Sequence, residues 1–257
     1  MKAHSVLLAL FLLIGYTINI VAQVDRNLRF THLTNDNGLP TNTIYSLCQD
    51  FKGFIWIATA NGLCKYDGRS ISVYEVEPTK GERKKGGIIR HVFEDKRHRL
   101  WVITHKGVNL YNRNKDNFNF VSVDSLNNFS RVIYQDDKGK IYMGGSGAFI
   151  YNEQTSKFDP FYVNQDETIT AFITAITSDQ KGQMWFGRMY GGLICADVEN
   201  GKLTRYKHND HNINSLISNK VTSLFTDHHG RIWIGTEDKG ICYFDSSTNK
   251  FIRIEGF

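Results

Sequence analysis

The chain has 257 residues, with 31 lysines and arginines against 26 aspartates and glutamates, and its formal net charge is +5. The basic residues are scattered along the sequence and form no stripe, so the composition does not favour a nucleic-acid-binding protein. No stretch has the pattern of a long helix, and nothing in the sequence marks a separate second domain.

Residues 1–22 have the pattern of a secretory signal peptide. Lys2 precedes an apolar run at 6–15, and the small residue Ala22 is suited to cleavage. An uncleaved membrane anchor is the alternative, because 16–22 is still fairly apolar and would extend the run toward the roughly 20 residues that span a membrane. We favour cleavage and export, since Asn19 interrupts the run.

Residues 28–33 alternate between apolar and polar side chains, like the outer strand of a sheet, but no earlier strands precede them. The segment that follows, 39–44, matches 216–221 near the end of the chain. This arrangement is typical of propellers, in which strands from the two ends of the chain close the ring.

One sequence pattern then occurs five times. In each copy an aspartate is followed, six residues later, by an aromatic residue. The pairs are Asp50 and Trp56, Asp95 and Trp101, Asp136 and Tyr142, Asp179 and Trp185, and Asp227 and Trp233. Consecutive aspartates lie 45, 41, 43 and 48 residues apart, a spacing typical of the four-stranded blades of a β-propeller.

Each copy predicts four antiparallel strands. An apolar run ends at the aspartate, and a polar turn connects it to a run of β-branched and aromatic residues, 54–59 in the first copy. Two further runs, 63–67 and 71–76, predict the third and fourth strands. We therefore predict an all-β propeller of four-stranded antiparallel blades. Five blades are expected, at about 41–76, 86–123, 129–163, 168–207 and 216–257, with 28–33 as an orphan outer strand.

The aspartates and aromatic residues of the repeat are interpreted as structural. A blade cannot bury both of its faces alone, so neighbouring blades stack around an axis and the aromatic residue fills the interface between them. The aspartates are interpreted as turn-stabilising side chains that accept hydrogen bonds from nearby backbone N–H groups. We predict no metal and no cofactor, since no loop matches a calcium-binding pattern.

The fifth copy has an outer strand of its own, so the strand at 28–33 has no blade to complete. We expect an incomplete ring, in a chain that is the front part of a longer protein. Five blades that close in some other way are the alternative. An open ring would expose one apolar sheet face at each end, which predicts self-association.

The four cysteines are expected to be free and mostly buried thiols. Cys64 and Cys242 occupy the same position in different blades, which places them too far apart to bond. Cys48 is separated from Cys64 by an intervening strand, about 9 to 10 Å at the usual strand spacing. A contact between Cys195 and Cys242, in adjacent blades, is the alternative.

The repeat resembles that of the two-component regulator propeller family. The resemblance rests on D-x-x-G-x-I-W-x-G-T followed by G-L and Y-D, nearly intact at 50–67 and 227–245, and on the junction 37–42. It covers 24–257. In that family the propellers form the periplasmic sensor region of hybrid histidine kinases that control glycan utilisation, typically with seven blades. The resemblance implies a non-catalytic periplasmic sensor, glycan-responsive, with five blades of a seven-bladed ring and truncated before the membrane span and kinase core.

The same resemblance implies the partners. They are an oligosaccharide ligand and either the remaining blades or a second sensor chain, with no nucleic acid and with a membrane only through missing downstream segments. The ligand is expected on the loops that join second to third strands and fourth to next first strands. The candidate ligand-binding residues there are Asn61, His105, Lys106, Arg188, Tyr190 and Asp238.

Tyr190 is the most suggestive of these residues, because an exposed aromatic side chain beside Arg188 could stack on a sugar ring. The alternative is an ordinary loop residue that packs on its own blade.

An enzyme is the less favoured class, although some bacterial propellers are lyases or hydrolases. Catalysis would need a convergent acid and base or a metal cluster. His208 and His211 lie in a polar loop without partners at a persuasive metal-binding spacing. Arg90 and Arg131, near the axis, could bind an anionic substrate, but single charges are equally expected for solvation. A protein-interaction scaffold is the alternative function, ahead of a propeller lyase or hydrolase.

Overall fold

The computed structural model describes residues 30–76, 87–104, 106–123, 130–161, 169 and 171–254. The chain divides into two compact units, 1–33 and 34–257. In the first unit only 30–33 are described, and they form no strand. The predicted signal peptide, 1–22, lies outside the described residues, as does the start of the predicted outer strand at 28–33.

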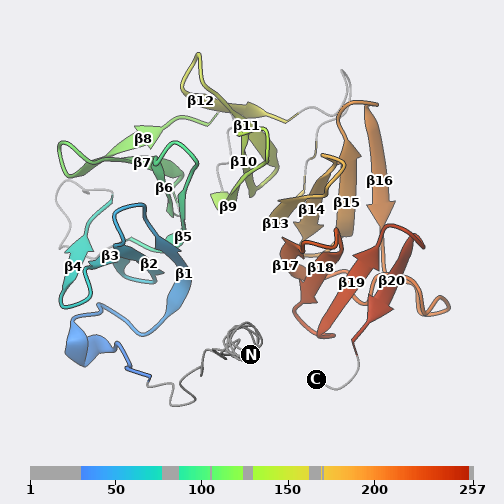
Figure 1. Ribbon diagram of the computed structural model, residues 1–257, viewed down its shortest axis with the longest axis horizontal. Helices are drawn as coiled ribbons and strands as arrows, with labels where there is room; N and C mark the ends of the chain where they lie inside the picture. The colour runs from blue at the N-terminus through green and yellow to red at the C-terminus, as the bar shows by residue number, and fades with distance from the viewer. Residues whose placement is uncertain are drawn as a thin grey trace, which may run out of the picture. The chain divides into compact units, whose positions relative to one another are not determined.

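The second unit consists of five four-stranded antiparallel sheets (Figure 1). In each sheet the strands lie in chain order, so that each pairs with the next. The strands are β1 (Ile44–Gln49), β2 (Ile55–Thr59), β3 (Gly62–Tyr66) and β4 (Ile71–Tyr74); β5 (Ile89–Glu94), β6 (Leu100–Thr104), β7 (Val108–Asn112) and β8 (Asn117–Val121); β9 (Ser130–Gln135), β10 (Ile141–Gly145), β11 (Ala148–Asn152) and β12 (Lys157–Pro160); β13 (Ile173–Ser178), β14 (Met184–Arg188), β15 (Gly192–Asp197) and β16 (Lys202–Tyr206); β17 (Val221–Thr226), β18 (Ile232–Thr236), β19 (Ile241–Asp245) and β20 (Lys250–Arg253).

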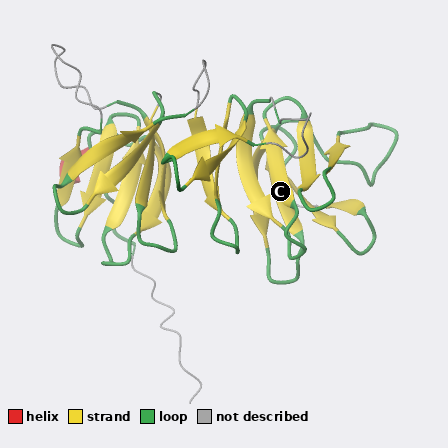
Figure 2. Cartoon of the chain, turned by 90° about the horizontal axis from the view of Figure 1, so that it is seen from above, coloured by secondary structure: helices red, strands yellow, loops and turns green. Residues whose placement is uncertain are grey.

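The sheets follow one another in chain order, and the first strand of each contacts the first strand of the next. Figure 2 shows the strands running between two sets of loops. The prediction of an all-β propeller with four-stranded antiparallel blades is confirmed. A ring of seven blades remains a prediction, since the structure describes five. Before β1, a short 3-10 helix, η1 (Asn35–Asn37), leads to Leu39, which packs on the first sheet.

The hydrophobic core is divided among the interfaces between neighbouring sheets. The ring of Trp56 lies 4.9 Å from that of Tyr111 in the second sheet. The ring centres of Trp101 and Tyr151 of the third sheet lie at the same distance. So do those of Trp185 and Phe244 of the fifth sheet. Each of these three tryptophans therefore packs against the third strand of the following sheet. This explains why each blade needs a neighbour to bury its Trp.

The turn between the first and second strands is closed by the repeated aspartate. In the fifth sheet, Asp227 Oδ1 accepts hydrogen bonds from the backbone N–H groups of His229 and Arg231, at 2.9 and 3.0 Å. The turn needs one residue in the left-handed region, which glycine supplies in four sheets. In the second sheet His98 takes that conformation with φ of 62°.

No helix in the described part of the chain is long and apolar enough to cross a membrane. All four cysteines are free: Cys64, Cys195 and Cys242 are buried, and Cys48 is half-buried. Within the same described ranges, no group of three or more His, Cys, Asp or Glu side chains has the arrangement of a metal site.

Candidate functional site

Each first strand contains a β-bulge close to the end at which it begins. In β1, Ile44 pairs with Thr59 and Ser46 pairs with the adjacent Ala58, so that Tyr45 is the extra residue. The same shift occurs in β5, β9, β13 and β17. The bulged residues, which we call the bulge ring, are Tyr45, Arg90, Arg131, Thr174 and Thr222. A bulge leaves its extra residue out of the ladder and redirects the side chain.

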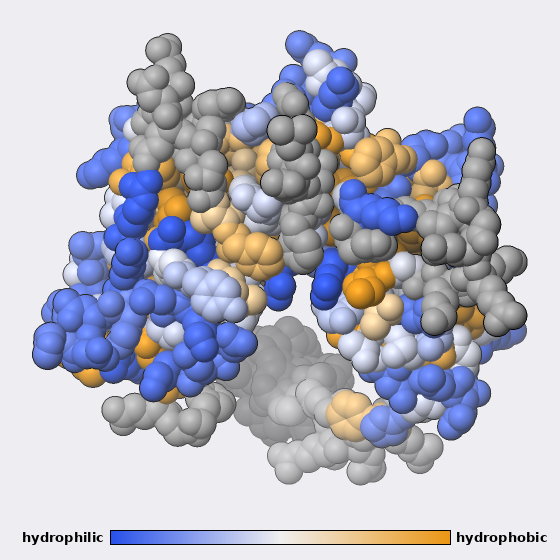
Figure 3. All heavy atoms as spheres, turned by 180° about the vertical axis from the view of Figure 1, so that it is seen from behind, coloured by the Kyte–Doolittle hydropathy of each residue, from blue (hydrophilic) through white to orange (hydrophobic). Residues whose placement is uncertain are grey.

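All five members of the bulge ring line one concavity of about 540 Å³. All five first strands contribute to its walls. Figure 3 shows a hollow in one face of the second unit, bordered by both hydrophilic and hydrophobic residues. The volume is within the range of small-molecule sites in proteins. The described residues that line it include two arginines and one histidine, and no aspartate or glutamate.

The positive charge in this concavity comes from the second and third sheets. The guanidinium of Arg90 lies 5.1 Å from the ring centre of Tyr45, and that of Arg131 lies 5.9 Å from the ring centre of Phe172. In the fourth sheet, by contrast, the hydroxyl of Thr174 donates to the backbone oxygen of Val221 at 2.6 Å. The bulge ring therefore has a cationic part and a neutral part.

Burial lowers the pKa of two residues on these walls. Burial lowers the pKa of Arg131, and the positive charge of Arg90 lowers it further. Burial also lowers the pKa of His91 to about 4. The imidazole of His91 is therefore neutral at pH 7, and its Nδ1 has no hydrogen-bond partner among the described residues.

The predicted ligand-binding residues lie in loops at the same end of the sheets as the bulge ring. This follows from the pairing of strands, because Thr59 pairs with Ile44 beside the first bulge and with Gly62 across the β2–β3 loop. Tyr190, in the loop between β14 and β15, is 79% exposed. Arg188, the last residue of β14, donates from Nη2 to the backbone oxygen of Gly191. Burial and the charge of Arg205 both lower the pKa of Arg188.

The other candidates occupy the corresponding loops of the first, second and fifth sheets. Asn61 and Lys106 are exposed. Asp238 accepts a hydrogen bond from Ser218 at 2.7 Å and lies 3.5 Å from the ammonium of Lys220. The Ser218 hydroxyl is the main cause of the lowered pKa of Asp238, and Lys220 adds to it. His105 lies outside the described residues. The six residues remain predictions as a ligand site.

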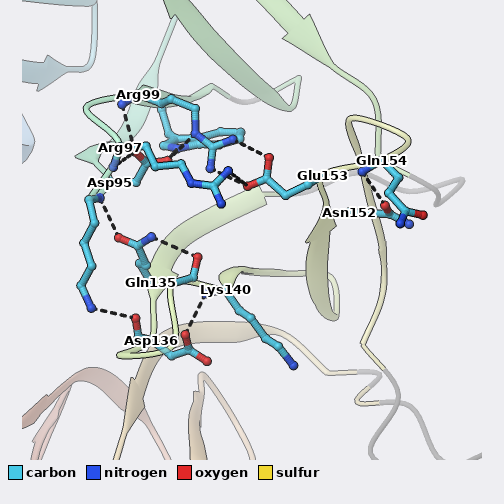
Figure 4. A network of polar contacts seen from close by, with 12 residues as sticks. Asp95, Arg97, Arg99, Gln135, Asp136, Lys140, Asn152, Glu153 and Gln154 are labelled. Carbon is cyan, nitrogen blue, oxygen red and sulfur yellow. Dashed lines mark hydrogen bonds and ion pairs between the residues drawn. The ribbon is translucent and has the colours of Figure 1, made fainter.

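The opposite end of the sheets, where the aspartate turns lie, is occupied by contacts that join neighbouring sheets. Arg99 bonds Asp95 of its own sheet at 2.6 Å and Glu153 of the third sheet at 2.8 and 2.9 Å (Figure 4). The backbone N–H of Lys96 donates to Gln135 of the third sheet at 2.8 Å. A cavity of about 290 Å³ opens there between the third and fourth sheets.

The comparisons with known sequences identify the repeat. Residues 38–61 and 215–238 match the family model described as two component regulator propeller. An 82-residue stretch is 34% identical to histidine kinase P4 of Formosa agariphila, over 30% of this chain and 6% of that protein.

Solved structures share the fold over most of the chain. The extracellular domain of the putative hybrid two component system BT3049 from B. thetaiotaomicron is 24% identical, with a TM-score of 0.72 over 86% of this chain and 31% of that one. The corresponding domain of BT4673 from the same organism is 20% identical, with a TM-score of 0.70 over 89% and 29%.

A catalytically inactive virginiamycin B lyase from Staphylococcus aureus is 16% identical, with a TM-score of 0.64 over 89% of this chain and 74% of that one. That likeness shows the fold alone. The present chain spans about a third of the length of the two extracellular domains. The matches at 38–61 and 215–238 show that the chain contains two component regulator propeller repeats, and the five repeated sheets show that its fold is a β-propeller.

Proposed function

We propose that this chain is the ligand-binding propeller of a periplasmic sensor in a two-component regulatory system, and that its ligand is an oligosaccharide. It reaches the periplasm by means of the signal peptide at 1–22. The membrane span and the kinase core of such a sensor belong to segments other than this propeller. The propeller itself is non-catalytic in this proposal.

The observation that carries the proposal is the concavity surrounded by the bulge ring. Aspartate and an aromatic residue recur in every copy of the repeat, where they build the interfaces between sheets. At the bulge, by contrast, the copies have tyrosine, arginine or threonine. A fixed backbone position with variable side chains is suited to ligand selection, because the scaffold stays the same while the chemistry of the walls changes.

The loops beside the bulge ring supply the polar and aromatic groups expected of a saccharide site. Tyr190 offers an exposed ring on which a sugar could stack. Asn61, Lys106, Arg188 and Asp238 offer donors and acceptors for hydroxyl groups. His105 is a further candidate from the sequence. We propose that these loops form the rim of the site and that the bulge ring forms its floor.

Isothermal titration calorimetry of the full chain with a panel of oligosaccharides small enough to enter the periplasm tests this function. We expect one oligosaccharide of the panel to bind. Tyr190→Ala should lower its affinity about tenfold, as expected for the loss of one stacking contact. Phe120→Ala is the matched control, because Phe120 is an exposed aromatic residue on the outer strand β8. If no oligosaccharide binds at millimolar concentration, the sensor proposal is contradicted.

A protein-interaction scaffold is the second candidate. Leu47 and Phe225, on the first and fifth sheets, are each 64% exposed, and apolar side chains of this size favour contact with another protein. Sedimentation of the chain, together with the saccharide titration, separates the two candidates. A scaffold would form stable assemblies and bind no saccharide, whereas a sensor propeller would bind saccharide at the bulge ring whether or not it self-associates.

A further inference from the structure

We propose that the concavity binds an anionic group of the ligand, a carboxylate or a sulfate, through Arg131 and Arg90. This inference rests on the proposed function only for the statement that the anion is carried by a saccharide. The site itself is argued from the positions, the surroundings and the charges of the two arginines.

The two arginines occupy the same structural position in adjacent sheets. Each is the bulged residue of an innermost strand, β5 for Arg90 and β9 for Arg131. The two first strands contact each other. Both guanidinium groups therefore reach the same concavity from neighbouring walls. Two arginines that converge on one space provide paired N–H donors, the geometry that carboxylate and sulfate oxygens accept best.

Aromatic rings support both guanidinium groups. Arg90 lies over Tyr45, and Arg131 lies over Phe172. Stacking of this kind holds the face of a guanidinium, and the N–H donors lie on its edge. The rings thus orient the charges without neutralising them.

Arg131 differs from Arg99 and Arg113, two other half-buried arginines, in its surroundings. Arg99 and Arg113 both bond carboxylates, at 2.6 to 2.9 Å. No carboxylate of the described residues lies within ion-pair distance of Arg131, and its strongest electrostatic neighbour is the like charge of Arg90. Two like charges in a partly buried space are costly. A bound anion would relieve that cost, because none of the described residues that line the concavity carries a negative charge.

The remaining walls suit a saccharide that carries the anion. His91 is neutral, and its buried Nδ1 has no hydrogen-bond partner in the described structure. Ser223 adds a hydroxyl group. The volume of about 540 Å³ is enough for one or two sugar rings, by comparison with typical ligand sites.

Titration of the full chain with three probes tests the proposal. The probes are a uronic-acid disaccharide, the neutral disaccharide of the same linkage, and inorganic sulfate. For the wild-type chain we expect the uronic-acid disaccharide to bind at least tenfold more tightly than its neutral counterpart, with sulfate as a competitor. Arg131→Gln should abolish this preference, and Arg131→Lys should retain part of it. Arg69→Gln, an exposed site in the β3–β4 turn at the other end of the first sheet, should retain all of it.

The outcomes separate the anion site from the saccharide function. Equal affinity for the two disaccharides, or a preference that survives Arg131→Gln, would overturn the anion site and leave the sensor proposal standing. Sulfate binding that depends on Arg131, without binding of either disaccharide, would support the anion site and contradict the saccharide ligand. If none of the probes binds, the anion site is overturned.

Discussion

Asp227 accepts a hydrogen bond at 2.8 Å from the indole N–H of Trp233, six residues later in the chain. The equivalent bond is present in every sheet, at 3.0, 2.9, 3.1 and 3.2 Å in the first to fourth, with a tyrosine hydroxyl as the donor in the third. One carboxylate thus closes the turn through Oδ1 and anchors the interface aromatic residue through Oδ2. The repeated offset of six residues has its physical cause in this pair.

Removing the indole donor should destabilise the fold where the tryptophan is buried. Trp101 is fully buried, and Trp101→Phe removes the N–H that bonds Asp95 while leaving a small cavity. We expect a loss of about 1–3 kcal/mol in the free energy of unfolding, measured by urea denaturation. Trp233→Phe is the matched control in the fifth sheet, where the side chain is half-buried, and it should cost less. Equal losses in the two variants would contradict this explanation.

Arg113 links the first two sheets, and we expect it to contribute to the pH dependence of the free energy of unfolding in acid. Its guanidinium bonds Asp50 at 2.9 Å and Glu94 at 2.6 Å. Burial acts to raise the pKa of Asp50, but hydrogen bonds from Trp56 and Arg113 outweigh it and the pKa is lowered. The unfolded chain therefore takes up the proton first as the pH falls. This stabilisation is present above about pH 4, the usual pKa of Asp, and is lost as the pH falls through the lower pKa of the folded state.

Arg113→Gln should therefore reduce stability by about 2 kcal/mol at pH 7, since charge-assisted hydrogen bonds are lost. It should also make the decline between pH 5 and pH 2 less steep. Thermal unfolding across this range measures both effects. Arg69→Gln, at an exposed turn, is the control and should match the wild type. If the variant loses stability between pH 5 and pH 2 as steeply as the wild type, Arg113 does not set the pKa of Asp50.

The buried histidine of the concavity should add a second pH dependence. Burial lowers the pKa of His91 to about 4, below the value of about 6.5 in an unfolded chain. The folded state thus resists protonation, so stability is full above about pH 6.5 and declines as the pH falls from there toward pH 4. His91→Gln should flatten the thermal stability curve within this window. A curve that stays as steep as that of the wild type would assign the decline to other groups.

The cysteines should differ in reactivity because they differ in burial. Burial raises the pKa of Cys64 and of Cys242 to about 11, and that of Cys195 to about 12. Only the thiolate reacts with a disulfide reagent. Cys48 is half-buried, so it should react first in the folded chain, and all four should react in denaturant. Cys48→Ser should remove the fast phase, and its persistence would contradict this order.

Much of the fold could be predicted from the sequence because the repeat is physically constrained. The turn requires the aspartate, and the interface requires the aromatic residue, so both recur at fixed offsets, as in Asp50 and Trp56. The bond between them was not predicted, although the constant offset was the signal for it. Alternation in 28–33 predicts an outer strand, and a strand forms only where another strand is available to pair. The described part of that segment, 30–33, forms no strand.

The candidate site could be predicted only in part. The loops that contain Asn61 and Tyr190 follow from strand order, so their placement at one end of the sheets is a consequence of topology. The bulge ring is different, since its members are one tyrosine, two arginines and two threonines, and no turn signal marks them. The sequence indicates that Arg90 and Arg131 are charges near the axis. The β-bulges that bring both into one concavity can be recognised only from the strand pairing.

The central claim is that the bulge ring is the floor of a ligand site. A crystal structure of the chain with an oligosaccharide that binds in titration tests this claim most directly. We predict electron density for the ligand within hydrogen-bond distance of Arg131 and beside the loop of Tyr190. Density confined to the aspartate turns, near Asp136 and Asp179, would contradict it and would assign binding to the opposite end of the sheets.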